Sequence, residues 1–354
     1  MPKPPEASID MSTRARGARP SQANELPPFR PSGLIANAHM QSILTSSPWR
    51  KRRVQKRSLA YRENAERRVI STPEGVHLLG YHSRPASPNG ALVVLLHGWE
   101  GSSDSNYLLD TALALDAAGF ETFRLNFRDH GDSHHLNPGL FHSCRLEEVV
   151  QAVGEVTAEH RAGGGQVFLA GFSLGGNFAL RVARNAPAAG YRLDHVVAVS
   201  PVIRPKNVLA ALADGFPIYE QYFVRKWRRS LKRKQRLYPE RYNLAGWFRH
   251  RNLADQTSHL VDDYTEFPDI DAYLEGYSIA GDYLEGLEIP SLIITAADDP
   301  IIPISDFETL ARPETLELEI WPHGGHCGFI ANWRLESWIE QRIVSELCQH
   351  LTPA

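Results

Sequence analysis

The sequence has few cysteines, little net charge and no long hydrophobic run. Only three cysteines occur in 354 residues and none forms a Cys-x-x-Cys pair, which excludes a disulfide framework and a zinc ribbon. The formal net charge of −3 gives no sign of a polyanionic partner, so we expect no nucleic acid partner. No apolar stretch is long enough to span a bilayer. Together these features predict a reducing, cytoplasmic location.

The first 28 residues are polar and rich in proline, and they lack the apolar core of a secretion signal. This composition predicts a disordered tail over residues 1–28. Met11 is a second candidate for the start of the chain, and the sequence leaves the choice between Met1 and Met11 open.

Strand and helix patterns alternate after residue 68. Residues 69–71 and 76–83 predict a hairpin, and the run ALVVLLH at 91–97 is typical of a strand buried on both faces. Further strands are predicted at 122–127, 166–172 and 195–200, with helices at 107–118, 145–160 and 174–185. Such alternation predicts a doubly wound, mostly parallel sheet.

The alternation stops between residues 201 and 289, where aromatic and basic helical stretches replace it. It resumes with a strand at 291–297, a helix near 305–311, a strand at 316–321 and a final helix at 332–351. We therefore predict an α/β core made of residues 29–200 and 290–354. Residues 201–289 are predicted to form a helical cap inserted over the carboxyl edge of the sheet.

A Gly-x-Ser-x-Gly sequence, GFSLG at 171–175, lies between a predicted buried strand and a predicted helix. In that context a tight, strained turn exposes the serine hydroxyl, and small residues on either side avoid clashes. The amino end of the following helix favours developing negative charge. We therefore predict that Ser173 is a nucleophile; the alternative is a glycine-rich turn without chemistry.

A serine nucleophile needs a base and an acid that orients the base, and in this kind of fold the chain order is Ser, Asp, His. Asp299 follows the strand at 291–297 and precedes Ile-Ile-Pro, whereas Asp298 is the competing acid. His326 follows two glycines in the loop before the final helix, whereas His323 is the competing base. We predict that Asp299 and His326 complete the set.

An oxyanion is stabilised by two backbone N–H groups. We predict that these belong to Leu174, which follows the nucleophile, and to Trp99 in the loop HGWEGSS at 97–103. The side chains of Trp99 and Phe172 are expected to contact substrate. Chemistry of this kind requires no cofactor and no metal, so we expect neither.

Several motifs give the chain a family resemblance. HGWEGSSDSNY at 97–107 and GFSLGGN at 171–177 resemble signatures of the YheT-like esterases, bacterial relatives of the embryogenesis-associated hydrolases in the α/β-hydrolase superfamily. NAHMQSI at 37–43, FHS at 141–143 and DDP at 298–300 are also similar to elements of that family. Asp129-His130 and Cys144 depart from the family pattern.

The resemblance runs from residue 29 to residue 351. It implies the α/β-hydrolase fold with a sheet of the eight-stranded type, and a catalytic triad of Ser173, Asp299 and His326. It also implies a serine hydrolase that cleaves short- to medium-chain or acylglycerol-like carboxylic esters, so the expected partner is a small-molecule ester. A thioesterase or an amidase would use the same triad, and a non-catalytic binding protein of this fold is a further alternative.

Residues 222–238 carry eight basic residues, and Phe223, Trp227 and Leu231 fall on one helical face. This pattern predicts a cap helix with its apolar face on the core and its charges in water. The alternative is peripheral contact with an anionic membrane surface.

His130, Asp132, His134 and His135 lie close together in the sequence. Metal ligation is one interpretation of such a group. We instead predict a solvent-facing loop near the pocket, because hydrolysis by a triad needs no metal.

Overall fold

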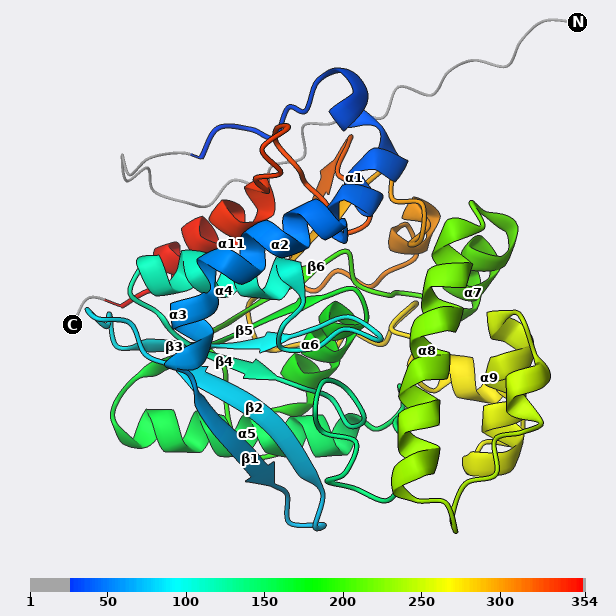
Figure 1. Cartoon of the computed structure of the whole chain (residues 1–354). Coiled ribbons are helices and arrows are strands. Elements are labelled where there is room, and N and C mark those ends of the chain that lie inside the picture. The colour runs from blue at the N-terminus through cyan, green and yellow to red at the C-terminus, as the bar shows by residue number, and fades with distance from the viewer. Residues whose placement is uncertain (1–25, 353–354) are drawn as a thin grey trace, which may run out of the picture.

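Eight strands form one mostly parallel sheet in the order β1-β2-β4-β3-β5-β6-β7-β8 (Figure 1). The computed structural model describes residues 26–352. β2 runs antiparallel to its neighbours β1 and β4, and the remaining pairs are parallel. This topology confirms the predicted fold class. The strands are β1 (Glu66–Ser71), β2 (His77–Ser83), β3 (Ala91–Leu96), β4 (Glu121–Leu125), β5 (Gln166–Phe172), β6 (His195–Val199), β7 (Ser291–Ala296) and β8 (Leu316–Trp321).

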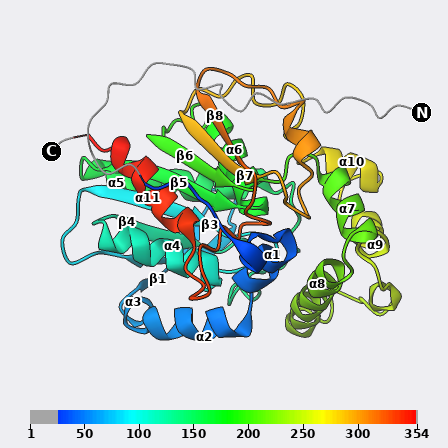
Figure 2. The same cartoon turned by 90° about the horizontal axis from the view of Figure 1, so that it is seen from above.

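Helices cover both faces of the sheet, which explains why the central strands are continuously apolar. Along β3, Val93 and Leu95 join the core cluster that contains residues of α4 (Asn106–Ala117) and α11 (Trp338–Gln349). Leu92, Val94 and Leu96 join the cluster on the other face, with α5 (Leu146–Ala162) and α6 (Leu174–Asn185). Figure 2 shows α4 and α11 together over one face. Every residue of β3 is therefore buried by a helix layer.

The segment before the sheet forms three short helices, α1 (Ala38–Thr45), α2 (Pro48–Arg57) and α3 (Leu59–Glu63), after a 3₁₀ turn at Gly33–Ala36. The Asn37 side chain caps α1 by accepting the N–H groups of His39 and Met40. Most of the predicted tail lies outside the described residues. Its last part packs against α11, since the carbonyl of Pro27 accepts the indole N–H of Trp338 at 2.8 Å.

Between β6 and β7 lie the inserted helices α7 (Pro205–Asp214), α8 (Ile218–Leu237), α9 (Leu253–Tyr264) and α10 (Ile270–Glu275), with a 3₁₀ turn at Trp247–Arg249. They gather at one side of the sheet (Figures 1 and 2). The helices coincide with the break in alternation, and the cap boundaries at 201 and 289 stay a prediction.

Two predicted helices are shorter than expected. The one near residues 305–311 is a 3₁₀ turn at Ile304–Phe307, confined between Pro303 and Pro313. The final helix begins at Trp338 instead of residue 332. Phe329 and Leu335 have positive φ angles of 45° and 58°, which a helix does not accommodate.

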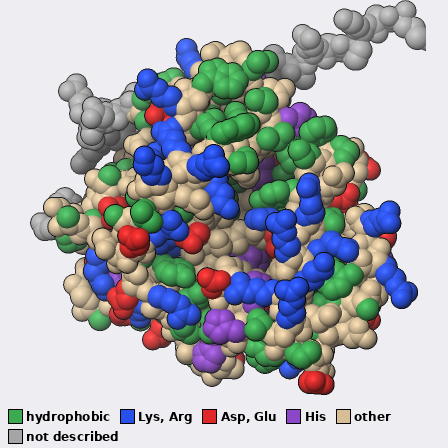
Figure 3. Space-filling model, viewed as in Figure 1, with side chains coloured by type: hydrophobic (Ala, Val, Ile, Leu, Met, Phe, Trp, Pro, Cys, Tyr) green, Lys and Arg blue, Asp and Glu red, His purple; other side chains and the backbone are tan. Residues whose placement is uncertain are grey.

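The apolar stripe of α8 faces inward. Trp227 and Leu231 are buried and Phe223 is half-buried, whereas most Lys and Arg side chains gather on the exposed surface over α8 (Figure 3). Lys234 departs from the prediction that the charges lie in water, because it is fully buried. The role of α8 as a cap helix and its contact with an anionic membrane stay predictions. Across residues 26–352, no helix combines the length and apolar composition needed to cross a membrane.

A buried charge cluster ties the amino-terminal helices to the core. The Arg50 side chain of α2 is 1% exposed and contacts Asp110 of α4 at 3.0 Å and Glu340 of α11 at 2.7 Å. Burial raises the pKa of Glu340 to about 8, and the nearby Arg50 guanidinium opposes that rise. Arg57 of α2 also contacts Asp110 at 3.3 Å but is partly exposed, so Arg50 is the buried cation that joins the three helices.

We predict that Arg50→Ala lowers the free energy of unfolding by about 3–5 kcal/mol, because it removes the buried cation between two buried carboxyl groups and leaves only the partly exposed Arg57 beside Asp110. Urea denaturation measures the loss. The control is Arg53→Ala, since Arg53 contacts Glu336 at 3.2 Å with both side chains partly exposed. That change should cost less than about 1 kcal/mol. Equal losses in the two variants would contradict the assignment of Arg50 as a core anchor.

Candidate active site

Ser173 occupies a strained turn between β5 and α6. Its φ and ψ angles are 54° and −118°, a conformation that L-residues rarely adopt. A Cβ atom on Gly171 would lie 2.1 Å from the carbonyl oxygen of Gly175, and one on Gly175 would lie 2.4 Å from that of Leu96. Both glycines of the motif are therefore required by close backbone contact.

A continuous hydrogen-bonded chain joins the three residues predicted to carry the chemistry. Ser173 Oγ lies 2.9 Å from His326 Nε2, and His326 Nδ1 lies 2.9 Å from Asp299 Oδ2. The other carboxylate oxygen of Asp299 accepts the N–H groups of Ile301 at 2.8 Å and Ile302 at 3.0 Å. The Asp299 side chain is fully buried, so these bonds hold the acceptor toward His326.

The competing residues Asp298 and His323 contact one another instead. Asp298 Oδ2 lies 3.3 Å from His323 Nδ1, and Asp298 Oδ1 accepts the N–H of Gly325 at 2.9 Å. These contacts brace the loop that carries His326. The geometry therefore gives the two acids different surroundings, and only Asp299 is linked to Ser173 through a histidine.

The amino-terminal helix α1 also holds this loop. Ser42 Oγ accepts the backbone N–H of His326 at 2.9 Å and donates to the carbonyl of Ala38 at 2.8 Å. Gly325 has a φ angle of 53°, and a Cβ there would lie 2.5 Å from the carbonyl oxygen of Ala38. The loop thus packs directly on α1, a contact that sequence reasoning missed because it joins residues far apart in the chain.

The carboxylate of Asp299 controls the ionisation of His326. Burial alone would lower the pKa of this imidazole, but the adjacent Asp299 and the neighbouring Cys327 together outweigh burial and raise the pKa of His326 well above 6.5. The imidazolium form is therefore stabilised. This is the charge state that a general base reaches after it takes a proton.

The loop after β3 carries Trp99, which lines the cavity together with Leu174. Within residues 26–352, neither the Trp99 N–H nor the Leu174 N–H has a protein acceptor. Tyr107 Oη accepts the N–H of Gly98 at 2.8 Å, and His130 Nε2 accepts that of Glu100 at 3.1 Å. Tyr107 and His130 thus fix the loop on either side of Trp99, a role the sequence did not reveal.

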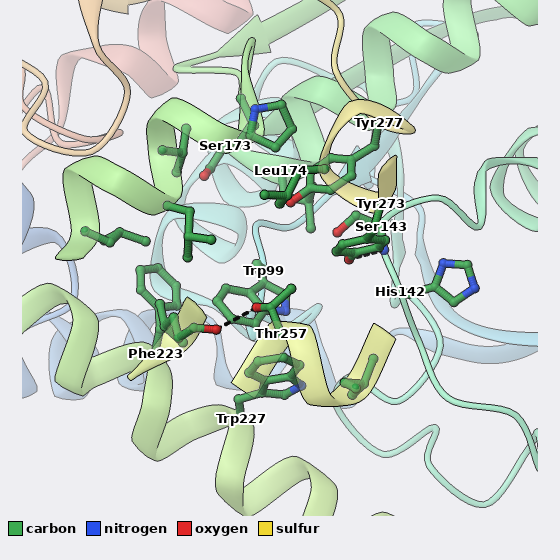
Figure 4. A pocket seen from close by; sticks show the side chains of 18 of the residues that line it. Trp99, His142, Ser143, Ser173, Leu174, Phe223, Trp227, Thr257, Tyr273 and Tyr277 are labelled. Carbon is green, nitrogen blue, oxygen red and sulfur yellow. Dashed lines mark hydrogen bonds between the residues drawn. The ribbon is translucent and has the colours of Figure 1, made fainter. Parts of the chain in front are cut away.

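A mostly apolar cavity opens at Ser173 (Figure 4). The Trp99 indole stacks on Phe223 with ring centroids 5.2 Å apart and meets Trp227 edge-on at 5.1 Å. The inserted helices supply much of the lining. Apolar residues of the lining include Val202, Val208, Leu209, Leu212, Leu253, Leu260, Leu274 and Ile301, and its hydroxyl groups come from Ser143, Thr257, Tyr273 and Tyr277.

The prediction that Phe172 contacts substrate is corrected by the structure. Phe172 is fully buried, packs against Tyr107 with ring centroids 4.9 Å apart, and is absent from the cavity lining. Its side chain belongs to the core cluster on the α4 and α11 face. Trp99, by contrast, lies in the lining, and its contact with substrate stays a prediction.

The prediction of a solvent-facing histidine loop is also corrected. His130 and His134 are buried, and His134 Nε2 lies 2.9 Å from Ser230 Oγ of α8, while Asp132 and His135 are exposed. Burial lowers the pKa of His130 to about 4 and that of His134 to about 3. Neutral imidazoles therefore serve as packing and hydrogen-bonding groups under α8.

Asp129, one of the departures from the family pattern, anchors the same helix. Its Oδ1 lies 2.6 Å from the buried Nζ of Lys234, and its Oδ2 accepts the N–H of Phe141 at 3.0 Å. Lys234 also donates to the carbonyl of Asn137. This buried ion pair fixes α8 above the loop that contributes Phe141 to the cavity.

The comparisons with known proteins agree with the fold. The family model described as the alpha/beta hydrolase fold matches residues 91–332, which is more than half of the chain. The chain therefore belongs to the alpha/beta hydrolase fold family. Within that family its sequence is similar to YheT-like proteins.

YheT of Escherichia coli, whose name classes it among the esterases, is 27% identical, with 91% of this chain and 94% of that protein covered. The embryogenesis-associated protein EMB8 of Picea glauca is 26% identical over 69% of this chain and 54% of its own length. The solved structure of a Pyrococcus furiosus esterase is similar in fold, with a TM-score of 0.56, 15% identity, and 81% of this chain and 91% of that chain covered.

We predict that Gly175→Ala destabilises the protein by about 1–3 kcal/mol or more, because the new methyl group overlaps two backbone carbonyls of the β3 edge. The same variant should lose esterase activity, since relieving the overlap displaces Ser173. Thermal unfolding and ester hydrolysis measure the two effects. Gly286→Ala is the control, because its Cβ meets only the flexible Arg184 side chain at 3.6 Å. Wild-type activity in Gly175→Ala would contradict this account of the turn.

Proposed function

We propose that the protein is a serine hydrolase that cleaves carboxylic esters through an acyl-enzyme. The observation that carries the proposal is the hydrogen-bonded chain from Ser173 through His326 to Asp299, with both links at 2.9 Å. Such a chain supplies a nucleophile, a general base and an acid that orients the base. The cavity that opens at Ser173 provides a place for the substrate.

In the proposed reaction Ser173 Oγ attacks the ester carbonyl while His326 Nε2 takes its proton. Asp299 holds the imidazole in the tautomer with hydrogen on Nδ1 and stabilises the cation that forms. The N–H groups of Trp99 and Leu174 bind the tetrahedral oxyanion. His326 then protonates the leaving alkoxide, and a water molecule repeats the sequence on the acyl-enzyme to release the acid.

The mostly apolar lining of the cavity favours a substrate with an apolar part. Aliphatic residues from α7 and α9, together with Trp99, Phe223 and Trp227, suit a short- to medium-chain acyl group or an acylglycerol. We propose that the inserted helices act as a cap that keeps this space from water. A thioesterase or amidase would use the same triad, and matched ester, thioester and amide substrates separate these activities.

We predict that Ser173→Ala reduces hydrolysis of p-nitrophenyl butyrate to background, because the variant lacks the attacking oxygen. Asp299→Asn should lower kcat by about 10³–10⁴, since an amide in place of the carboxylate selects the wrong imidazole tautomer. Steady-state kinetics on each purified variant measures both effects.

Asp298→Asn is the matched control for the acid. Its carboxylate contacts Gly325 and His323 but not His326, so a loss of no more than about tenfold is expected from a loosened loop. A larger loss in Asp298→Asn than in Asp299→Asn would reverse the choice between the two acids. Retained wild-type activity in Ser173→Ala would remove the nucleophile assignment.

We predict that kcat/KM rises with pH and reaches half its maximum above pH 6.5. Only neutral His326 accepts the serine proton, and Asp299 raises the pKa of this imidazole, so the neutral form accumulates at a higher pH than for an ordinary histidine. In Asp299→Asn the residual activity should titrate at lower pH. Measurement of kcat/KM at a series of pH values across the neutral range tests both expectations. A midpoint below pH 6.5 in the unchanged protein, or no shift in the variant, would contradict the role of Asp299.

A further inference from the structure

A second cluster of titratable side chains lies at the opposite end of the sheet from Ser173. His195 is the first residue of β6, and Glu346 and His350 lie one helical turn apart at the end of α11. The carboxyl ends of the parallel strands carry the candidate active site, so this cluster is at the amino-terminal edge. The proposed hydrolysis uses none of these residues.

The potential donor atoms have the spacing of metal ligands. Glu346 Oε1 lies 3.1 Å from His195 Nε2 and 3.3 Å from His350 Nε2, and all three donor atoms lie within 4.8 Å of one another. Ligand atoms about 2.0–2.1 Å from a tetrahedral zinc ion are separated by about 3.3 Å. Both nitrogen–oxygen separations are therefore close to the edge of such a tetrahedron.

His195 is an unpaired polar group in a buried position. The residue is 4% exposed, and neither ring nitrogen has a hydrogen-bond partner among the residues that the structure describes. Its Nε2 is near the Glu346 oxygen, but the geometry of a hydrogen bond to that oxygen is not met. A buried imidazole without a hydrogen-bond partner is available as a metal ligand.

Neighbouring residues orient the other two donors. Arg342 Nη1 lies 2.9 Å from Glu346 Oε2, which leaves Oε1 directed at both histidines. The imidazole rings of His195 and His350 stack with centroids 3.9 Å apart, so the rings must tilt for both Nε2 atoms to converge on one ion. Gln166 donates to the carbonyl of His350 at 3.0 Å. The Arg342 contact to the carboxylate is the kind of supporting contact that is typical of metal sites.

We propose that His195, Glu346 and His350 bind a divalent transition-metal ion, with Zn²⁺ as the best match. Two imidazoles and one carboxylate are ligands that zinc accepts, with water completing the shell. The ion would join the end of α11 to the start of β6 and so strengthen the contact between a surface helix and the central sheet. The alternative occupant is a proton shared between the carboxylate and the histidines.

The test is a Zn²⁺ titration of the full-length, chelator-treated protein without a polyhistidine tag, followed by calorimetry and thermal unfolding. We expect one ion per chain and a higher Tm with Zn²⁺. His350→Ala should weaken binding by at least about tenfold and abolish the Tm increase, because it removes one of three ligands. His350 is partly exposed, so the variant should fold.

His160→Ala is the matched control. His160 is also partly exposed near a helix end, and its ring contacts only the carbonyl of Gly90 at 3.2 Å. It should bind Zn²⁺ like the unchanged protein. His195→Gln provides a second variant, and Co²⁺ absorption provides a second measurement of binding.

Three results would overturn the proposal. One is that Zn²⁺ does not bind, in which case the carboxylate and the histidines share only a proton. Another is equal binding in His350→Ala and His160→Ala. A third is that Zn²⁺ still binds to His350→Ala and that ester hydrolysis falls in proportion to the Zn²⁺ bound. That result would place the ion at His326 instead.

Discussion

The position of Ser173 depends on one steric constraint. The turn between β5 and α6 passes so close to the backbone of β3 and of the turn itself that Gly171 and Gly175 have no room for a side chain. The chain can make this approach only if Ser173, midway between the two glycines, adopts a φ angle of 54°. Strain of this kind persists only where the surrounding structure enforces it. Here the enforcement comes from a sheet whose central strands are buried on both faces.

Two acid–histidine pairs lie beside Ser173, and each pair has a different role. Asp299 is linked through His326 to the serine, whereas Asp298 and His323 support the glycine-rich loop. Helix α1 completes the support, because Ser42 and Ala38 contact the same loop. The amino-terminal helices are in turn tied to the core by Arg50, so the geometry at His326 relies on packing far from the reacting atoms.

Sequence patterns predicted the parts of this arrangement that are local. The serine turn and the continuous apolar strands follow from short-range spacing, whereas the order of Ser173, Asp299 and His326 was inferred from the chain order typical of this kind of fold. Phe172 was assigned to the wrong surface, because it precedes the turn and its side chain packs into the core on the other face of the sheet.

Contacts between distant segments were not predictable from the sequence. The contact that covers His134 comes from α8, about a hundred residues later, and the support of His326 depends on α1, almost three hundred residues earlier. The grouping of His195 with Glu346 and His350 likewise arises only when β6 and α11 come together.

The central claim is that Ser173 forms a covalent intermediate. The most direct test is reaction of the protein with a fluorophosphonate probe, followed by mass spectrometry of the digested chain. The account predicts that the added mass is found on the peptide containing Ser173, and that labelling slows sharply in His326→Ala, which removes the base. Absence of labelling, or a label on a different residue, would contradict the claim and favour a binding protein with the same fold.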